Sequence, residues 1–115
     1  YKNLDRIDLI LTETASGNHV GIFILKNISE RPELGKIIGN SLYKGKGLAK
    51  ISSKNIINFG FKVFNLVKIY ALTRSDNLIN ISLNKKIGFQ IEEKILAKEQ
   101  EWIIMSITSN NFNEE

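Results

Sequence analysis

Apolar and polar residues alternate loosely through the first third of the chain. Three such segments, rich in Ile and Leu, predict β-strands over Arg6 to Thr12, His19 to Asn27 and Glu33 to Gly39. Ala15 to Asn18 predicts a turn between the first two strands, because Gly and Asn tolerate the positive φ that a reversal needs. Ser29 to Pro32 predicts a second turn. The first part of the chain is therefore expected to be an antiparallel meander.

The spacing of apolar residues changes after a loop rich in Gly and Lys. From Gly47 to about Phe64 they recur at helical spacing, and one broad apolar face holds Ala49, Ile56, Phe59 and Val63. The remaining segments are, in order, a strand over Val67 to Thr73, a helix with N-cap candidates Ser75, Asp76 and Asn77 that stops at Gly88, and strands over Phe89 to Leu96 and Glu101 to Thr108.

The predicted order of elements is β-β-β-α-β-α-β-β. The first helix connects the third and fourth strands, which implies a right-handed crossover with parallel pairing there, or a splayed neighbour. We therefore expect an α+β or α/β chain with a mixed, mostly antiparallel sheet. A length of 115 residues suits a single domain over residues 1–115.

Composition narrows the function classes. Hydrophobic residues make up 43% and charged residues 24%, as in globular proteins, and no apolar run approaches a membrane span. Without cysteine, and with His19 as the only histidine, the sequence predicts no thiolate or His-rich metal site and no cysteine nucleophile. No secretory leader is visible, so a cytoplasmic protein is expected. The net charge of +4 suits an anionic ligand but is too small by itself to imply nucleic acid.

The segment Lys44-Gly45-Lys46-Gly47-Leu48-Ala49 follows a strand and opens a helix. Glycines let backbone amides converge on an anion, and a helix N-terminus adds free N–H groups and partial positive charge. Together with Lys50, the lysines favour a pyrophosphate. The spacing matches neither a P-loop, which needs Gly at 40 and Ser or Thr at 47, nor G-x-G-x-x-G, which needs Gly at 50. A tight turn with solvated lysines is the structural alternative.

The segment resembles the acetyl-coenzyme A loop of the GNAT family of N-acetyltransferases, in which Gln or Arg is followed by two residues, Gly, one residue and then Gly or Ala. Here Lys44 stands for the Gln or Arg. Downstream, Asn77 and the run Asn80-Ile81-Ser82-Leu83-Asn84-Lys85-Lys86-Ile87-Gly88-Phe89 resemble the family's Asn-x-x-Ala-Ile-x-Leu-Tyr-Glu-Lys-x-Gly-Phe segment. The early strands resemble the ribosomal-protein and polyamine acetyltransferase branch.

The resemblance implies an acyl-CoA N-acyltransferase-like fold that binds acetyl-CoA as a substrate where the sheet splays open. Backbone groups of Ile37, Ile38 and Gly39 would pair with the pantetheine arm. Asn77 would contact the cofactor, although a plain N-cap also explains its position. The pyrophosphate would be held by the loop and the first helical turn, which comprise Lys44, Gly45, Lys46, Gly47, Leu48, Ala49 and Lys50.

The implied reaction is direct attack of an amine on the thioester. An alkylamine has a pKa near ~10.4, so a base must remove its proton. Glu33 is the base candidate, because it lies at the spacing from Gly47 at which histone-type members of the family carry a catalytic glutamate. The family's usual tyrosine acid is replaced by Asn84, which cannot release a proton. A thiol pKa near ~8.5 makes the thiolate a tolerable leaving group.

Three functions are compatible with the sequence. The first is an N-acetyltransferase acting on a protein N-terminus, a polyamine or an amino sugar, with a homodimer compatible with the sequence. The second is a non-catalytic acyl-CoA-binding module. The third, a nucleic-acid-binding domain, is disfavoured because aromatics do not alternate with Lys or Arg along a strand. Since the family domain is longer, we also expect Tyr1 to be an interior residue of a longer fold.

Overall fold

The computed structural model describes residues 5–12, 19–38 and 47–112. The order of elements is the one predicted from the sequence, β-β-β-α-β-α-β-β. The strands and helices, in chain order, are β1 (Arg6–Thr12), β2 (His19–Lys26), β3 (Glu33–Ile38), α1 (Leu48–Val63), β4 (Lys68–Arg74), α2 (Leu78–Ile87), β5 (Gln90–Ala97) and β6 (Gln100–Thr108). Each observed boundary lies within about two residues of its prediction, as expected where Gly, Asn and Pro mark the ends of elements.

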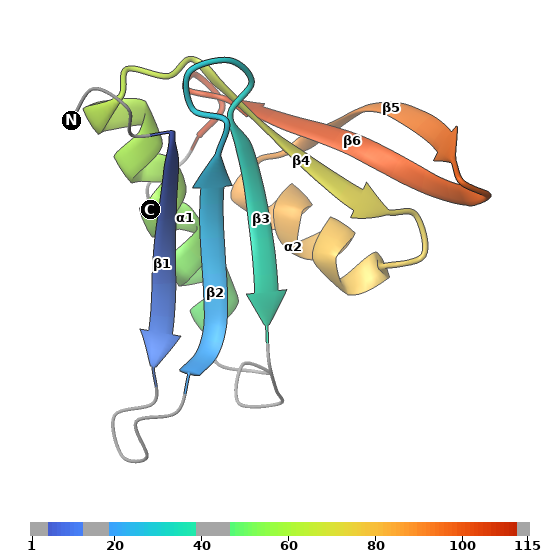
Figure 1. Cartoon of the computed structure of the whole chain (residues 1–115), viewed down its shortest axis with the longest axis horizontal. Helices are drawn as coiled ribbons and strands as arrows, with labels where there is room; N and C mark the ends of the chain where they lie inside the picture. Colours follow the sequence, from blue (N-terminus) through green and yellow to red (C-terminus); the bar gives the residue numbers. More distant parts are fainter. Residues whose placement is uncertain (1–4, 13–18, 39–46, 113–115) are drawn as a thin grey trace.

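The strands form one six-stranded mixed sheet in the order β1-β2-β3-β4-β6-β5. Every neighbouring pair is antiparallel except β3 and β4, which α1 connects as a crossover. The parallel contact is short, because it consists of the single register pair Glu33 and Tyr70, together with a 2.8 Å bond from the Tyr70 amide to the Pro32 carbonyl. From this point β3 and β4 run apart in Figure 1. Both alternatives predicted for this crossover, parallel pairing and a splayed neighbour, are therefore present.

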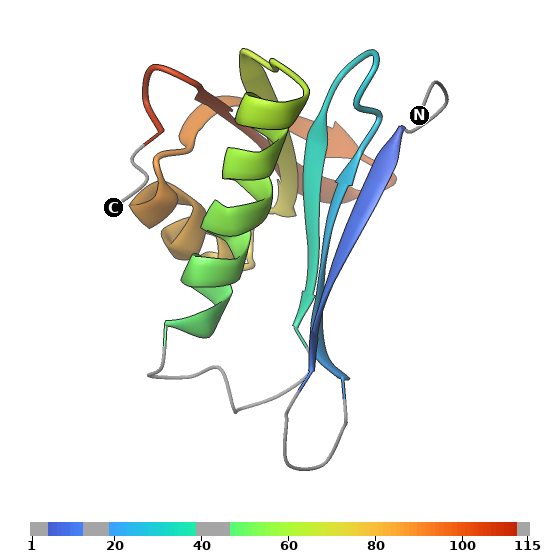
Figure 2. The ribbon, with the colours of Figure 1, turned by 90° about the vertical axis from the view of Figure 1, so that its left-hand side faces the viewer.

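Both helices pack on one side of the sheet, as Figure 2 shows. Inward-facing residues of β2, β3, β4 and β6 and the buried sides of α1 and α2 form one apolar core. Its most deeply buried side chains include Phe23, Leu25, Ile57, Ile69 and Met105. The opposite side of the sheet carries the other half of each strand's side chains, including Glu33 and Tyr70, because successive residues of a strand point to opposite faces.

The buried side of α1 differs in part from the predicted apolar face. Ile56 and Ile57 are buried, whereas Phe59 is 44% exposed and Val63 is 55% exposed. The helix instead approaches the sheet through Gly60, where an added Cβ would lie 2.9 Å from Leu25 Cδ2. A glycine at this position lets the helix sit close to β2, and this close approach turns the larger apolar residues Phe59 and Val63 toward the rim.

Candidate functional site

The N-terminus of α1 is the described part of the Gly-Lys segment. Gly47 precedes the helix in the left-handed region, with φ 68° and ψ 12°, and an added Cβ there would meet nothing within 4 Å. No side chain in the described part of the chain caps this end, and the first turn holds no acidic residue. The first helical amides, those of Leu48, Ala49 and Lys50, therefore have no intrahelical acceptor, the condition under which a helix end accepts an anion. Gly39, Lys44, Gly45 and Lys46 lie outside the described residues.

The edge of β3 that faces β4 is the second component of the site. Backbone groups of successive strand residues point to opposite edges, and the Pro32 carbonyl points to β4. Leu34, Lys36 and Ile38 therefore direct their N–H and C=O groups to the same edge, while Ile37 directs its own to β2. Among the described residues, no register pair joins this edge to β4 beyond Glu33. The unpaired edge opens toward the end of β3 that precedes α1. The Ile37 side chain is 61% exposed on the face opposite the helices.

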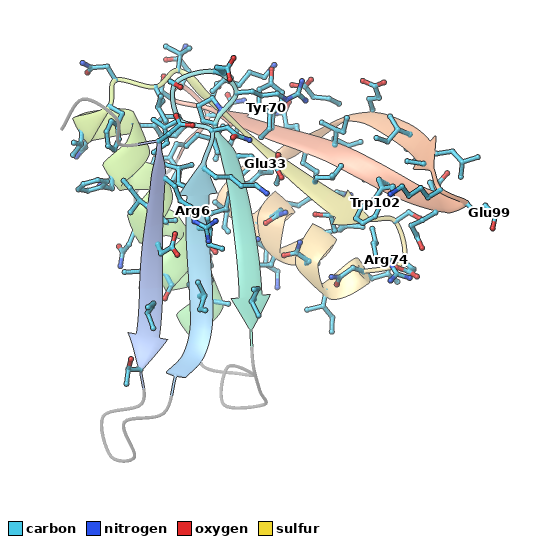
Figure 3. All side chains as sticks on the ribbon, viewed as in Figure 1. Arg6, Glu33, Tyr70, Arg74, Glu99 and Trp102 are labelled. Carbon is cyan, nitrogen blue, oxygen red and sulfur yellow. The ribbon has the colours of Figure 1, made fainter. Side chains whose placement is uncertain are left out.

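Glu33 lies at the point where β3 and β4 meet, on the face opposite the helices. Its side chain is 27% exposed, and a carboxylate oxygen lies 3.9 Å from Lys26 Nζ. Figure 3 labels Glu33 and Tyr70 close together at the top of the sheet. The Tyr70 ring is contacted by two cations, with the Arg31 guanidinium 4.0 Å and the Lys68 ammonium 5.0 Å from its centre.

An ion pair adjoins Tyr70 on the same face. Lys68 Nζ lies 2.6 Å from a Glu92 carboxylate oxygen, and the Ser106 hydroxyl also donates to Glu92. These two hydrogen bonds hold the pKa of Glu92 below its ordinary value, while the bond to Glu92 raises the pKa of Lys68. Lys68, one of the two cations on the Tyr70 ring, thus has a carboxylate partner of its own in Glu92.

Asn77 is the N-cap of α2. Its Oδ1 accepts a hydrogen bond of 3.1 Å from the Asn80 amide, and the helix begins at the next residue. The capping alternative raised from the sequence is therefore confirmed. Contact between Asn77 and a cofactor stays a prediction, which would fall to the Nδ2 group because the oxygen already serves the cap.

Asn84 is fully buried on the inner side of α2. Its Oδ1 accepts a hydrogen bond from Lys36 Nζ, and its Nδ2 points to Met105 Sδ at 3.7 Å. Lys36 Nζ also donates to Asn80 Oδ1 at 2.9 Å, so the side chain reaches from β3 to two successive turns of α2. Burial lowers the pKa of Lys36 from its ordinary 10.5 to about 8.

Sequence reasoning missed Lys36. The pattern of β3 contained the signal, because Lys36 lies two residues after the inward-facing Leu34 and a lysine on that side must find polar partners. Those partners follow 44 and 48 residues later, so only the folded chain identifies them.

Within residues 5–12, 19–38 and 47–112, no group of three or more His, Cys, Asp or Glu side chains is arranged to hold a metal ion. None of the helices described there is long and apolar enough to cross a membrane.

Residues 2–90 match the acetyltransferase (GNAT) domain family. The chain belongs to this family. The match covers the three early strands, the Gly-Lys segment and α2, and therefore includes Glu33, Lys36, Gly47, Asn77 and Asn84. The family resemblance drawn from the sequence is confirmed.

Curated relatives and solved structures agree with the GNAT assignment. Spermidine N(1)-acetyltransferase of Escherichia coli K12 is 33% identical over 72 residues, which are 63% of this chain and 38% of the relative. An uncharacterized N-acetyltransferase of Bacillus subtilis strain 168 is 35% identical over 66 residues, which are 55% of this chain and 39% of the relative. The chain thus matches about two fifths of the length of each relative.

Two solved structures show the same fold. Ribosomal-protein-S5-alanine acetyltransferase of Vibrio fischeri superimposes with a TM-score of 0.86 at 19% identity, covering 97% of this chain and 66% of that one. Spermidine N-acetyltransferase of Vibrio cholerae, solved in complex with CoA and spermine, superimposes with a TM-score of 0.80 at 21% identity, covering 95% of this chain and 69% of that one. At these identities the likeness establishes the GNAT fold, which confirms the fold class predicted from the sequence.

Proposed function

We propose that the chain binds acetyl-CoA between β3 and β4 and transfers the acetyl group directly to a primary amine. The observation that carries the proposal is the parting of β3 and β4 after a single register pair, in a GNAT domain whose α1 begins without a side-chain cap. An unpaired strand edge and an open helix N-terminus suit, respectively, the amides and the pyrophosphate of one extended ligand.

Acetyl-CoA would lie with its pyrophosphate at the amides that follow Gly47 and its pantetheine arm along the unpaired edge of β3. The backbone polarity favours Lys36 and Ile38 as the pairing residues on this edge, rather than Ile37. Gly39, Lys44, Gly45 and Lys46 are the further predicted contacts from the sequence. With the pyrophosphate at α1, the thioester end of the arm would point toward Glu33 and Tyr70, the register pair at which β3 and β4 meet.

In this arrangement the amine would approach on the sheet face that carries Glu33. The carboxylate would take the amine's proton, directly or through water, as nitrogen attacks the thioester carbon. A backbone N–H near Gly39 would stabilise the negative charge that develops on the carbonyl oxygen. Removing a general base of this kind lowers the rate by roughly 10²–10⁴-fold.

Among the acceptors considered, a polyamine is favoured, and a protein N-terminus comes second. A polyamine is supported by similarity to the spermidine N(1)-acetyltransferase of Escherichia coli and to the spermidine N-acetyltransferase of Vibrio cholerae. A protein N-terminus is supported by the fold shared with ribosomal-protein-S5-alanine acetyltransferase. Direct transfer requires no acyl-enzyme cysteine, which agrees with a chain that contains none.

A non-catalytic acyl-CoA-binding module is the second candidate. It is favoured by Asn84, which stands at the position of the family's tyrosine acid but cannot release a proton. The Asn84 side chain is fully buried and accepts a hydrogen bond from Lys36. Both candidates require the same cofactor cleft and differ only in turnover.

The deciding experiment measures acetyl-CoA binding by calorimetry and thiol release with spermidine, an alanine-ended peptide and glucosamine. We expect release with spermidine, a kcat lowered about 10²-fold by Glu33→Gln, and no change with Glu30→Gln, a matched exposed carboxylate in the preceding turn. Binding without release for any amine would favour the module. Absence of binding would overturn both candidates.

A further inference from the structure

Lys36 is held in a fixed position on the inner side of the opening between β3 and β4. Its side chain leaves β3 on the face that carries the helices, three residues past the register pair that ends the parallel contact. It reaches α2, where Asn80 Oδ1 and Asn84 Oδ1 both accept from Nζ. A partly buried lysine with no acidic partner among the described residues is uncommon, because the charged form loses part of its hydration.

The two asparagine amides are oriented by their other contacts. Asn80 Nδ2 donates to the hydroxyl of Thr73 at 3.0 Å, and Asn84 Nδ2 points to Met105 Sδ at 3.7 Å. With the NH₂ groups so engaged, both oxygens face Lys36. They act as acceptors only and thus stabilise the ammonium. An ammonium has three N–H donors. Two of them serve these oxygens, and the third has no acceptor in the part of the chain that the structure describes.

The backbone of Lys36 lies on the same unpaired edge of β3 along which the pantetheine arm is placed. A thioester there has two sides. With the arm placed as proposed, one side of the thioester would face the sheet surface that carries Glu33, and the other would face the ammonium of Lys36. An amine attacking from the Glu33 face and a sulfur leaving toward α2 would therefore meet different groups.

We propose that Lys36, oriented by Asn80 and Asn84, is the acid that protonates the sulfur of the departing coenzyme. The inference rests on the proposed function. As the tetrahedral intermediate collapses, the C–S bond breaks with its electron pair going to sulfur. One Nζ proton passes to that sulfur, which leaves CoA thiol, the N-acetylated amine and a neutral Lys36. Nitrogen loses two protons on passing from ammonium to amide, and Glu33 passes each of them in turn to solvent, from which Lys36 recovers one.

The environment of Lys36 suits this role. Burial brings its pKa to about 8, close to the ~8.5 of a thiol, so that the proton transfer is nearly balanced. Lys36 Nζ contacts Asn80 and Asn84 on α2, and these in turn contact Thr73 on β4 and Met105 on β6; none of the four titrates near neutral pH. Asn84 thus takes part by placing Lys36, a positioning role rather than proton transfer by the amide itself.

The test compares Lys36→Met, which removes the donor, with Lys36→Arg, which keeps the charge but does not release a proton in this pH range. Lys94→Met, on the exposed β5, is the matched control. Calorimetry at pH 8.5 compares CoA with desulfo-CoA, so that the ratio of the two dissociation constants reports contact with the sulfur. Turnover with spermidine is then followed from pH 6.5 to 9.5.

We expect the wild type and Lys94→Met to prefer CoA over desulfo-CoA by about tenfold, a preference lost in Lys36→Met and kept in Lys36→Arg. Both Lys36 variants should lower kcat about 10²-fold, and the fall of kcat above pH 8 should disappear in Lys36→Arg. If Lys36 were purely structural, Lys36→Arg would not keep the preference for CoA over desulfo-CoA while losing turnover. If Lys36→Met does not fold, the kcat and pH profile of Lys36→Arg decide.

Other results would overturn the proposal. A CoA preference that survives in Lys36→Met would show that Lys36 does not meet the sulfur, although intact acetyl-CoA binding would leave the proposed function standing. Acetylation of Lys36 itself, seen by mass spectrometry as the main product, would make it an acceptor rather than an acid. Failure of the wild type to bind acetyl-CoA would overturn the proposed function and this inference together.

Discussion

The helices α1 and α2 lie on the same side of the sheet but begin in opposite ways. α1 begins after Gly47, which offers no side chain, and no acidic residue lies in its first turn. α2 begins after Asn77, whose side chain caps the Asn80 amide. The end of α2 is fixed as well, because the Gly88 amide donates to the carbonyls of Asn84 and Lys85.

The start of α2 is therefore capped by the chain itself, whereas the start of α1 has amides that a ligand could reach. In α2 the Asn80 amide and the carbonyls of Asn84 and Lys85 find partners within the chain. Lys36 also joins the side of this helix to β3. In α1 no described residue outside the helix accepts from the first amides, and positively charged Lys50 belongs to the same turn. Free amides at an exposed helix end are normally satisfied by water or by an anion, so the start of α1 is compatible with the anion site proposed for it.

The largest expected effect concerns the two glycines that adjoin these helices. Gly88 has φ 126°, and an added Cβ would lie 3.1 Å from both Asn111 O and Ile107 Cδ1, whereas Gly47 has φ 68° with open space around it. Gly88→Ala should lower the free energy of unfolding by about 3 kcal/mol, and Gly47→Ala by only about 1 kcal/mol. Urea unfolding of the two variants measures the difference. Equal losses would contradict the assignment of Gly88 as the tightly packed position.

The burial of Lys36 between β3 and α2 should make stability depend on pH. Its folded pKa, about 8, lies below the ordinary 10.5 of the unfolded chain, so the unfolded chain binds more protons between these values. Stability from this group is therefore full above pH 10.5 and is lost as the pH falls through 8. Between pH 7 and 10 the wild type should gain on the order of 2 kcal/mol relative to Lys36→Met. Urea unfolding at each pH measures the two free energies of unfolding. If these free energies changed with pH in parallel for the wild type and Lys36→Met, the pKa of Lys36 would not be lowered in the folded chain.

The open end of α1 should respond to a single negative charge. Gly47→Asp and Gly47→Asn have nearly the same shape, and both residues tolerate the left-handed backbone at this position. Because the carboxylate would repel a pyrophosphate, Gly47→Asp should bind acetyl-CoA about tenfold more weakly than Gly47→Asn, and added salt should narrow the gap. Calorimetric titration at two salt concentrations measures this. Equal affinities would place the pyrophosphate elsewhere.

The order of elements could be predicted because local residues determine it. Asn77 and Gly88 mark both ends of α2, and the alternation in β1 to β3 sets their inner face. The exposure of Phe59 and Val63 could not be predicted, since it depends on how closely Gly60 lets α1 approach β2. Such an approach is a long-range contact that helical periodicity does not contain.

For the candidate site, the sequence predicted the Gly-Lys segment and Glu33, which stay predictions, and it did not single out Lys36. Glycines beside lysines form a local pattern, and so does the spacing from Glu33 to Gly47. The bond from Lys36 to Asn84, by contrast, joins residues 48 positions apart. From the sequence alone, Asn84 was interpreted only as a replacement for the family's tyrosine acid. The fold shows that its Oδ1 accepts a hydrogen bond from the partly buried Lys36.

The cap of α2 gives the smallest expected effect and the finest test of the comparison. Asn77→Ala removes the acceptor for the Asn80 amide and should cost about 1 kcal/mol of stability, whereas Asn77→Ser keeps a capping oxygen and should cost little. Both variants lose the Nδ2 donor. If that group contacts acetyl-CoA as predicted, both should bind it roughly threefold to tenfold more weakly, the loss expected for one hydrogen bond. Unchanged affinity in Asn77→Ser would make Asn77 a cap alone and leave all anion binding to α1.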